Sequence, residues 1–176
     1  RVTEEIEICR ANNIQIEIIP GVTAACAAAA DLQTSLTLRG VSRSVVFATP
    51  RVGRRESPNN QQWLAACLAA ETAVLYMAGA QAAEICTTLI QAGKPEETPI
   101  CIVESASRAT GIRLKSTLAK IAKEGLPPLA GPVSLLIGQA LGLAQLEGQT
   151  PLSLDHTTIA LETGTEPSKS CDLAFG

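Results

Sequence analysis

Aromatic residues, histidine and long apolar runs are scarce in this sequence, and each shortage excludes a class of protein. Phe, Trp and Tyr make up 2% of the 176 residues, too few for a protein that stacks nucleic-acid bases on aromatic rings. The single histidine, His156, argues against a histidine-based metal site or a catalytic triad. No apolar run approaches the roughly 20 residues of a membrane-spanning helix.

Net charge and the placement of the cysteines exclude further classes of protein. A formal net charge of -3 argues against nonspecific binding of nucleic acid. None of the six cysteines forms a C-x-x-C pair, and most fall in apolar periodic segments, as buried reduced thiols do. With no visible signal peptide, we expect a cytoplasmic protein. A phosphate-binding G-x-x-x-x-G-K-[ST] loop, a G-x-S-x-G elbow and paired carboxylates are also missing, so no catalytic side chain is predicted.

What the sequence contains is an alternation of strand-like and helix-like segments. Strands are predicted at residues 14–19, 44–48, 72–79, 98–105, 109–117 and 131–141, the fifth of them antiparallel to a neighbour. Helices are predicted at residues 3–12, 22–31, 59–70, 81–92 and 117–125, the fourth ending at Gly93. This order predicts an α/β fold whose mixed, mostly parallel sheet is flanked by helices. Residues after about Glu147 lose periodicity and read as a tail.

Three strand exits are the candidate ligand sites, because ligands of such sheets bind beyond the carboxyl ends of strands. They are residues 20–23, 76–79 and 104–106. At the first, Pro20-Gly21 makes a sharp turn and the next helix presents free N–H groups to a ligand. A Thr23 that only caps a closely packed helix is the alternative. Met77 could line an apolar pocket or fill the core.

Five arginines cluster between residues 39 and 55. Guanidinium groups pair with carboxylates through two parallel hydrogen bonds, so this region could hold a ligand with several carboxylates. A solvated loop, or contact with another domain, explains the cluster equally well.

Four segments in order resemble the tetrapyrrole methylases, especially the uroporphyrinogen-III C-methyltransferase branch. They are IEIIPGVTAACAAAADLQTSLTLRGVSRSVVFAT, VLYMAGAQAAEICTTLIQAG, TPICIVESASR and GPVSLLIGQALGL. Order and spacing agree over about residues 1–143. The resemblance implies that this part is the carboxyl-terminal domain of such a protein, with an amino-terminal domain absent before Arg1. It assigns residues 144–176 to a tail of unknown role.

The resemblance also implies an activity. Members of this family are two-domain α/β enzymes, usually homodimers, that bind S-adenosylmethionine between the domains and release S-adenosylhomocysteine. The uroporphyrinogen-III branch methylates C2 and C7 of uroporphyrinogen III to give precorrin-2, on the route to sirohaem and cobalamin. The implied cofactor contacts are Thr23, Ala24, Met77, Ala106 and the backbone near Val133. Substrate carboxylates would meet Arg39, Arg43 and Arg51.

Two departures from the family pattern concern the substrate more than the cofactor. Leu38 stands where the family has a histidine, and Thr49-Pro50-Arg51 replaces a T-G-H segment. Two alternatives therefore stay open: a methylase of another precorrin, and a non-catalytic module that kept the fold for binding or dimerisation. We expect the chain alone to be inactive.

Overall fold

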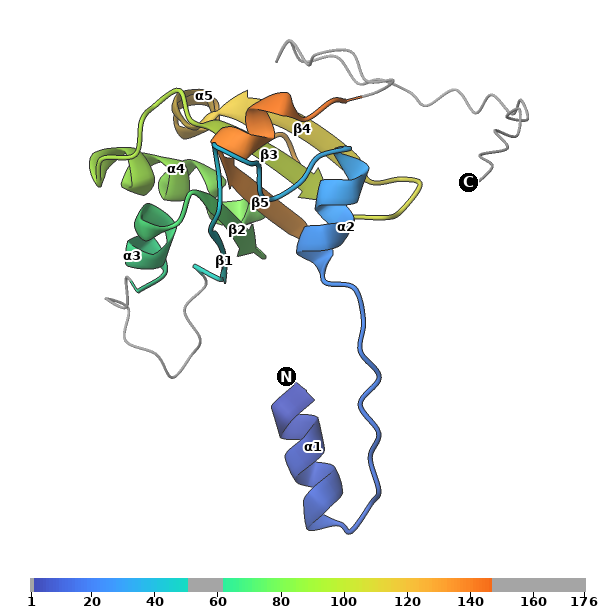
Figure 1. Ribbon diagram of the computed structural model, residues 1–176. Helices are drawn as coiled ribbons and strands as arrows, with labels where there is room; N and C mark the ends of the chain where they lie inside the picture. The colour runs from blue at the N-terminus through green and yellow to red at the C-terminus, as the bar shows by residue number, and fades with distance from the viewer. Residues whose placement is uncertain (1, 51–61, 147–176) are drawn as a thin grey trace, which may run out of the picture.

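Five strands form one sheet in the order β1-β2-β5-β3-β4. The computed structural model describes residues 2–50 and 62–146 (Figure 1). The strands are β1 (Val45–Ala48), β2 (Thr72–Tyr76), β3 (Pro99–Glu104), β4 (Ile112–Thr117) and β5 (Val133–Gly138). Each lies within a segment predicted to be a strand, and the α/β class with a mixed sheet is confirmed.

The direction of the strands differs from the prediction in one respect. β1 and β2 are parallel, whereas the pairs β2–β5, β5–β3 and β3–β4 are antiparallel. The expected antiparallel strand after residue 109 is confirmed as β4. The expected predominance of parallel pairs is wrong, because β5 inserts between β2 and β3 in the opposite direction and separates two strands that run the same way.

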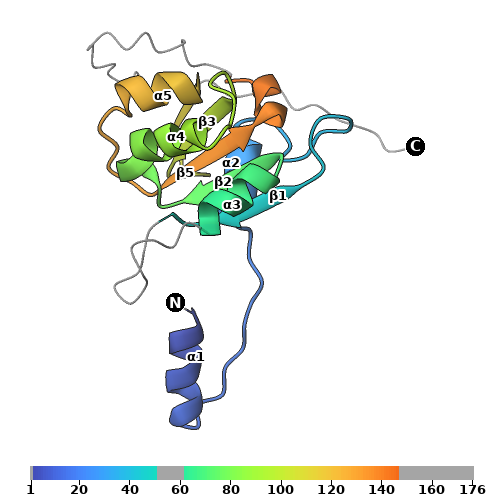
Figure 2. The ribbon, with the colours of Figure 1, turned by 90° about the vertical axis from the view of Figure 1, so that its left-hand side faces the viewer.

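Helices cover both faces of the sheet unequally. On one face lie α3 (Gln62–Ala69), α4 (Ala82–Gln91) and α5 (Leu118–Glu124), which stand in front of the sheet in Figure 2. The other face carries α2 (Ala24–Asp31) and the short 3₁₀ helix η2 (Gln139–Leu143). α4 ends just before Gly93, which adopts φ +101°. That left-handed residue confirms the predicted helix end.

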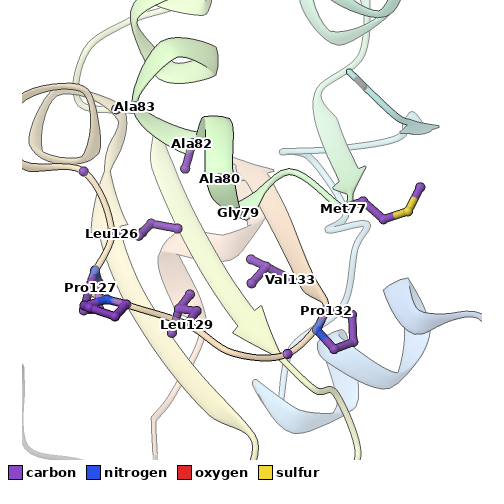
Figure 3. Close-up of a pocket in the computed structure, with 13 residues that line it drawn as sticks. Met77, Gly79, Ala80, Ala82, Ala83, Leu126, Pro127, Leu129, Pro132 and Val133 are labelled. Atoms are coloured by element: carbon purple, nitrogen blue, oxygen red, sulfur yellow. The ribbon is translucent and has the colours of Figure 1, made fainter. Parts of the chain in front are cut away.

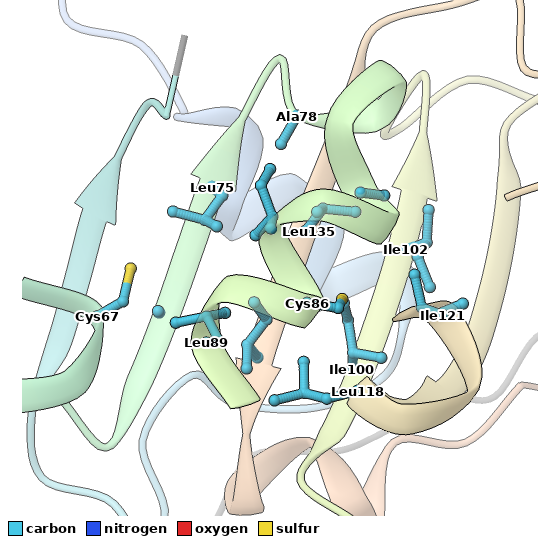
Figure 4. Packing of buried hydrophobic residues seen from close by; sticks show 14 of the residues in the cluster. Cys67, Leu75, Ala78, Cys86, Leu89, Ile100, Ile102, Leu118, Ile121 and Leu135 are labelled. Carbon is cyan, nitrogen blue, oxygen red and sulfur yellow. The ribbon is translucent and has the colours of Figure 1, made fainter. Parts of the chain in front are cut away.

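The core follows from the alternation of side chains along the strands. Leu75, Ile102 and Leu135 face α3, α4 and α5, and Figure 4 shows them packed against Cys86 and Leu89 of α4. Val74, Val103 and Leu136 point the other way, against Ala25 and Ala28 of α2. The three central strands β2, β5 and β3 are therefore buried on both faces, as continuous apolar runs predict.

The amino-terminal segment is the main departure from prediction. α1 (Val2–Ala11) forms as expected but buries no side chain, and Figure 1 shows it away from the sheet. The strand predicted at residues 14–19 is wrong: these residues are exposed and pair with no strand of the described chain. Alternation alone does not make a strand, because its N–H and C=O groups need a neighbouring edge.

One helix and one strand are shorter in the structure than the sequence predicts. α3 begins at Gln62, and residues 59–61 of the predicted helix lie outside the described residues. β2 ends at Tyr76 rather than Gly79, because the backbone turns at Met77. Within the described ranges, every helix is too short or too polar to span a bilayer.

Candidate functional site

The register of the sheet brings the ends of three strands to one edge. Tyr76, at the end of β2, pairs with Ser134, and Glu104, at the end of β3, pairs with Val133. β5 begins here because it runs opposite to both neighbours. We call residues 76–79, 104–107 and 131–134 the exit edge. The structure thus brings together segments that are far apart in the sequence.

Thr23 joins the start of α2 to the exit edge. Its backbone occupies the N-cap position, with φ -69° and ψ 148°, but its side chain makes no capping hydrogen bond. Instead its Oγ1 shares a hydrogen bond of 2.5 Å with the hydroxyl of Tyr76. Tyr76 also stacks on Phe47, with ring centroids 6.2 Å apart. The first N–H groups of α2, which have no partner inside the helix, therefore lie beside the end of β2.

The alanines of α2 serve close packing. Ala25 and Ala28 are completely buried against the sheet, whereas Ala24 at the start of the helix is exposed. A short side chain lets a helix backbone approach its neighbour closely, so the packing alternative is confirmed for the buried pair. Ala24 makes no such contact and stays a candidate for the ligand side.

A cavity of about 510 Å³ opens beside the end of β2. Met77, Gly79 and the start of α4 form one wall, and the connection 125–133 forms the other (Figure 3). Met77 is 58% exposed, so it is not a core methionine and the pocket alternative is favoured. Val133 closes the floor: a Cβ at Gly79 would lie 2.9 Å from the Cβ of Val133. Glycine at position 79 is therefore what allows this wall to approach β5.

The backbone at the exit edge is strained. Of the five non-glycine residues with positive φ in the described chain, three lie here: Met77 (φ 53°), Ser105 (φ 52°) and Ser107 (φ 62°). Ala106, between the two serines, packs against the core cluster of α2. Such conformations persist only where surrounding contacts over-determine them, and they cluster at ligand sites.

Hydrogen bonds hold the connection 125–132 against the exit edge. The carboxylate of Glu104, which is nearly buried, accepts a hydrogen bond from the backbone N–H of Gly131. One residue further on, the N–H of Ser105 donates to the carbonyl of Pro132 at 2.9 Å. The sequence did not single out this connection as part of the site. Its local signals, Pro127-Pro128 and Gly131-Pro132, indicate a loop but not where the loop lies.

Two of the predicted substrate arginines lie at the opposite edge of the sheet. Arg39 is in the turn closed by the Leu38–Ser42 bridge, and Arg43 stands just before β1. We call residues 38–44, 71–72 and 138 the far edge. The length of β2 separates the two edges by about 13 Å, at roughly 3.3 Å per residue. Arg51 lies outside the described residues, so a substrate role for all three stays a prediction.

The far edge is held by polar contacts between side chains and backbone. The Ser42 and Thr72 hydroxyls share a buried hydrogen bond of 2.8 Å. The Glu71 carboxylate accepts hydrogen bonds from the backbone N–H groups of Arg43 and Ser44. These two bonds lower the pKa of Glu71, because they favour its charged form.

Three cysteines are buried as free thiols, as the sequence predicted. Burial raises the pKa of Cys67 to about 11, that of Cys86 to about 12 and that of Cys101 to about 11. A thiol that stays protonated at neutral pH is a poor nucleophile, so these residues serve packing. In residues 2–50 and 62–146, no three side chains of His, Cys, Asp or Glu are grouped to hold a metal ion.

The chain matches the family model of the Tetrapyrrole (Corrin/Porphyrin) Methylases over residues 1–122. It belongs to the tetrapyrrole methylase family. The resemblance inferred from the four sequence segments is thereby confirmed.

Relatives of this tetrapyrrole methylase chain agree in sequence and in fold. It is 33% identical over 143 residues to the uroporphyrinogen-III C-methyltransferase of Pseudomonas fluorescens, covering 81% of this chain and 57% of that protein. It is also 33% identical over 146 residues to the siroheme synthase of Pseudoalteromonas atlantica, covering 81% and 30% respectively. The chain thus spans well under two thirds of either relative.

A solved structure shows the same fold. The uroporphyrin-III C-methyl transferase of Thermus thermophilus, complexed with S-adenyl homocysteine, superposes with a TM-score of 0.66 at 20% identity. The match covers 80% of this tetrapyrrole methylase chain and 60% of that one.

Proposed function

We propose that this chain supplies one wall of an S-adenosylmethionine site in an enzyme that methylates uroporphyrinogen III at C2 and C7, giving precorrin-2. The observation that carries the proposal is the meeting of Thr23, Met77, Ala106 and Val133 at one edge of the sheet. Family membership and the relative complexed with S-adenyl homocysteine support it. The other wall would come from an amino-terminal domain of the full-length protein, which we propose to be a homodimer.

The shape and lining of the exit edge suit this cofactor. A cavity of about 510 Å³ falls within the roughly 300–1,000 Å³ typical of small-molecule sites. Its walls are glycine, alanine, proline and aliphatic side chains, which suit a flat adenine base. Met77 and Val133 line the cavity, whereas Thr23, Ala24 and Ala106 lie outside it. We therefore assign the apolar part of the cofactor to the cavity and a polar part to the start of α2.

Each residue has a definite task in this proposal. The Thr23 hydroxyl shares one hydrogen bond with Tyr76 and can form a second one with the ligand. Ala24 and Ala106 leave room for the ligand, and the Met77 thioether packs against it. Bound S-adenosylmethionine would supply a methyl group on a positively charged sulfur. The residues of this chain hold and orient the ligand, and positioning can provide most of the rate gain.

The two departures from the family pattern lie at opposite ends of the sheet. Thr49-Pro50 directly follows β1, whose Ala48 pairs with Leu75 of β2, so it lies at the same end as Tyr76. Leu38 lies in the 38–42 turn at the far edge, away from Met77 and Val133. A substitution there changes nothing that the proposal assigns to the cofactor. The change at Leu38 therefore does not argue against binding of the cofactor.

Calorimetry of S-adenosylhomocysteine with the full-length protein tests the cofactor site. Thr23→Val removes the hydroxyl at nearly constant volume and should raise Kd about fivefold to tenfold, the value of one hydrogen bond. Thr88→Val is the matched control, because the Thr88 hydroxyl donates within α4 to the carbonyl of Glu84 at 2.8 Å. It should leave Kd unchanged. A wild-type protein that does not bind favours the non-catalytic module instead.

Mass spectrometry of the reaction product tests the substrate. Uroporphyrinogen III should gain two methyl groups with the full-length protein, and the chain of 176 residues alone should transfer none. Binding of S-adenosylhomocysteine without methylation of uroporphyrinogen III would point to another precorrin as the acceptor.

A further inference from the structure

A carboxylate holds the end of α2 that lies opposite Thr23. Asp31, the last residue of the helix, places Oδ1 3.1 Å from Nη2 of Arg113 on β4. Its other oxygen, Oδ2, accepts a hydrogen bond of 2.8 Å from the backbone N–H of Ser107. The Asp31 side chain is 13% exposed and that of Arg113 is 25% exposed, so water screens the ion pair only partly. One carboxylate therefore connects α2, β4 and the turn after β3.

Arg113 strengthens the same connection. Its Nη1 donates to the carbonyl of Gly111, which closes that turn, at 3.3 Å. Its backbone is fixed opposite Val103 in the β3–β4 pair. Gly111 itself has no room for a side chain, since a Cβ there would lie 2.9 Å from the carbonyl oxygen of Ser105. The two partners of the ion pair thus hold the turn at two points: Asp31 binds Ser107, and Arg113 binds Gly111.

The turn at residues 105–111, which Asp31 and Arg113 hold, also contains strained backbone. Ser105 and Ser107 both have left-handed backbones, and Ala106 lies between them. A left-handed conformation costs energy for any residue with a Cβ, so the turn would relax if its contacts were removed. Relaxation would move Ala106 relative to α2, against whose core cluster it packs.

Both ends of helix α2 therefore contact the exit edge, where the cofactor site is proposed. Thr23 binds Tyr76 at one end, and Asp31 binds Ser107 about 12 Å away, at roughly 1.5 Å per residue. Figure 1 shows α2 beside the β3–β4 connection. We propose that Asp31 is a positioning residue, which fixes the turn carrying Ala106 at a set distance from Thr23 and Ala24. This inference rests on the proposed cofactor site.

The need for such a residue follows from what faces the ligand. Ala24 and Ala106 have no side chain that could adjust to a ligand, so the position of their backbones decides how well the ligand fits. A shift of about 1 Å at such a site can cost up to 100-fold in activity. Asp31 itself touches no cofactor in this scheme and acts only through the turn.

Variants of Asp31 in the full-length protein test the inference. Asp31→Ala removes both contacts and should raise the Kd for S-adenosylhomocysteine by about 10-fold or more. Asp31→Asn keeps an acceptor for the Ser107 N–H but loses the charge that pairs with Arg113, and should fall between wild type and Asp31→Ala. Glu71→Gln is the matched control, because Glu71 also accepts backbone N–H bonds but at the far edge. It should lower Tm without changing Kd.

Two measurements separate the possible failures. If wild type binds and Asp31→Ala keeps the wild-type Kd while losing Tm, Asp31 is only structural and the inference is wrong. If wild type does not bind, the proposed function fails and this inference fails with it. Hydrogen exchange of the Ser107 amide needs no ligand, and Asp31→Ala should accelerate it. Unchanged exchange would show that Asp31 does not hold the turn, whatever the protein binds.

Discussion

The exit edge and the far edge belong to the same sheet but are built differently. At the exit edge, Met77, Ser105 and Ser107 adopt strained backbones around a cavity. At the far edge, the Ser42 and Thr72 hydroxyls bond each other, and Glu71 binds two backbone N–H groups. The three strained residues of the exit edge have no counterpart among the described residues of the far edge.

This difference separates stability from ligand binding. A network of satisfied polar groups makes the far edge rigid and contributes to the folded state. Strain at the exit edge opposes stability and is tolerated where function needs a particular backbone geometry. Substitutions at the far edge should therefore chiefly lower stability, whereas substitutions at the exit edge should chiefly weaken ligand binding.

The largest effect on stability is expected at Gly138, where β5 reaches the far edge. Its φ is +149°, and a Cβ there would lie 2.5 Å from the carbonyl oxygen of Glu71. Gly138→Ala should lower the free energy of unfolding by about 3 kcal/mol, combining backbone strain with a steric clash. Urea unfolding measures the loss. The Kd of folded protein for S-adenosylhomocysteine should stay unchanged.

Gly93 supplies the control for that substitution. It also has positive φ, at +101°, but open space surrounds the position of its Cβ. Gly93→Ala should cost only about 1 kcal/mol, the price of the conformation itself. Equal losses at the two glycines would show that the contact with Glu71 is unimportant.

The second effect is expected at Gly79 of the exit edge and should appear chiefly in binding. A Cβ at this position would lie 2.9 Å from Val133, so Gly79→Ala must move Val133 or the start of α4. Overpacking of this kind costs about 1–2 kcal/mol of stability, and here it reshapes the cavity wall. Calorimetry should show Kd raised about tenfold or more. A variant that loses stability but binds normally would remove the cavity from the cofactor site.

The sequence could predict where the strands lie but not how they pair. Apolar runs located the central strands β2, β3 and β5, because burial on both faces requires such runs. The insertion of β5 between β2 and β3 was not predictable from alternation, since pairing depends on distant segments. The same limit explains residues 14–19, whose alternating pattern lacks a neighbouring strand in the described chain.

In the candidate site, too, local features could be predicted from the sequence and contacts between distant residues could not. Two of the three strand exits could be chosen from the sequence, because the end of a strand is a local property, and the register brings 76–79 and 104–107 together. Residues 20–23 follow no strand, and Thr23 reaches the exit edge through its hydrogen bond to Tyr76. The arginine cluster was recognised by sequence proximity alone, and the fold places Arg39 at the far edge, so its substrate role stays a prediction. Contacts such as Asp31 with Ser107 join residues far apart in the chain and leave no local signal.

A smaller effect, of opposite sign, is expected when strain is relieved at the exit edge. Ser107→Gly keeps the backbone N–H that binds Asp31 and removes the cost of φ 62°. After allowance for the extra freedom of the unfolded chain, stability should rise by about 0.5 kcal/mol. At the far edge, Ser44→Gly should instead lower stability, because the Ser44 hydroxyl accepts the N–H of Glu71 at 3.0 Å. Losses in both variants would mean that Ser107 is not strained.

The smallest effect should depend on pH and belongs to Glu71. Hydrogen bonds from Arg43 and Ser44 lower its pKa in the folded protein below the ordinary value of 4.5. Stabilisation by the ionised carboxylate is therefore complete above about pH 4.5 and is lost as the pH falls through the lower folded pKa. Glu71→Gln keeps one acceptor oxygen but loses the charge, so its Tm should lie below that of wild type at pH 7. The gap should close as the solution becomes acidic.

Thermal unfolding of wild type and Glu71→Gln between pH 7 and pH 2 measures that gap. Glu97→Gln is the control, because Glu97 is an exposed glutamate whose carboxylate binds no backbone N–H in the described chain. Its Tm should follow wild type at every pH. A gap for Glu71→Gln that persists unchanged at low pH would mean that the charge contributes nothing. The far edge would then be held by the uncharged hydrogen bonds of Ser42, Ser44 and Thr72 alone.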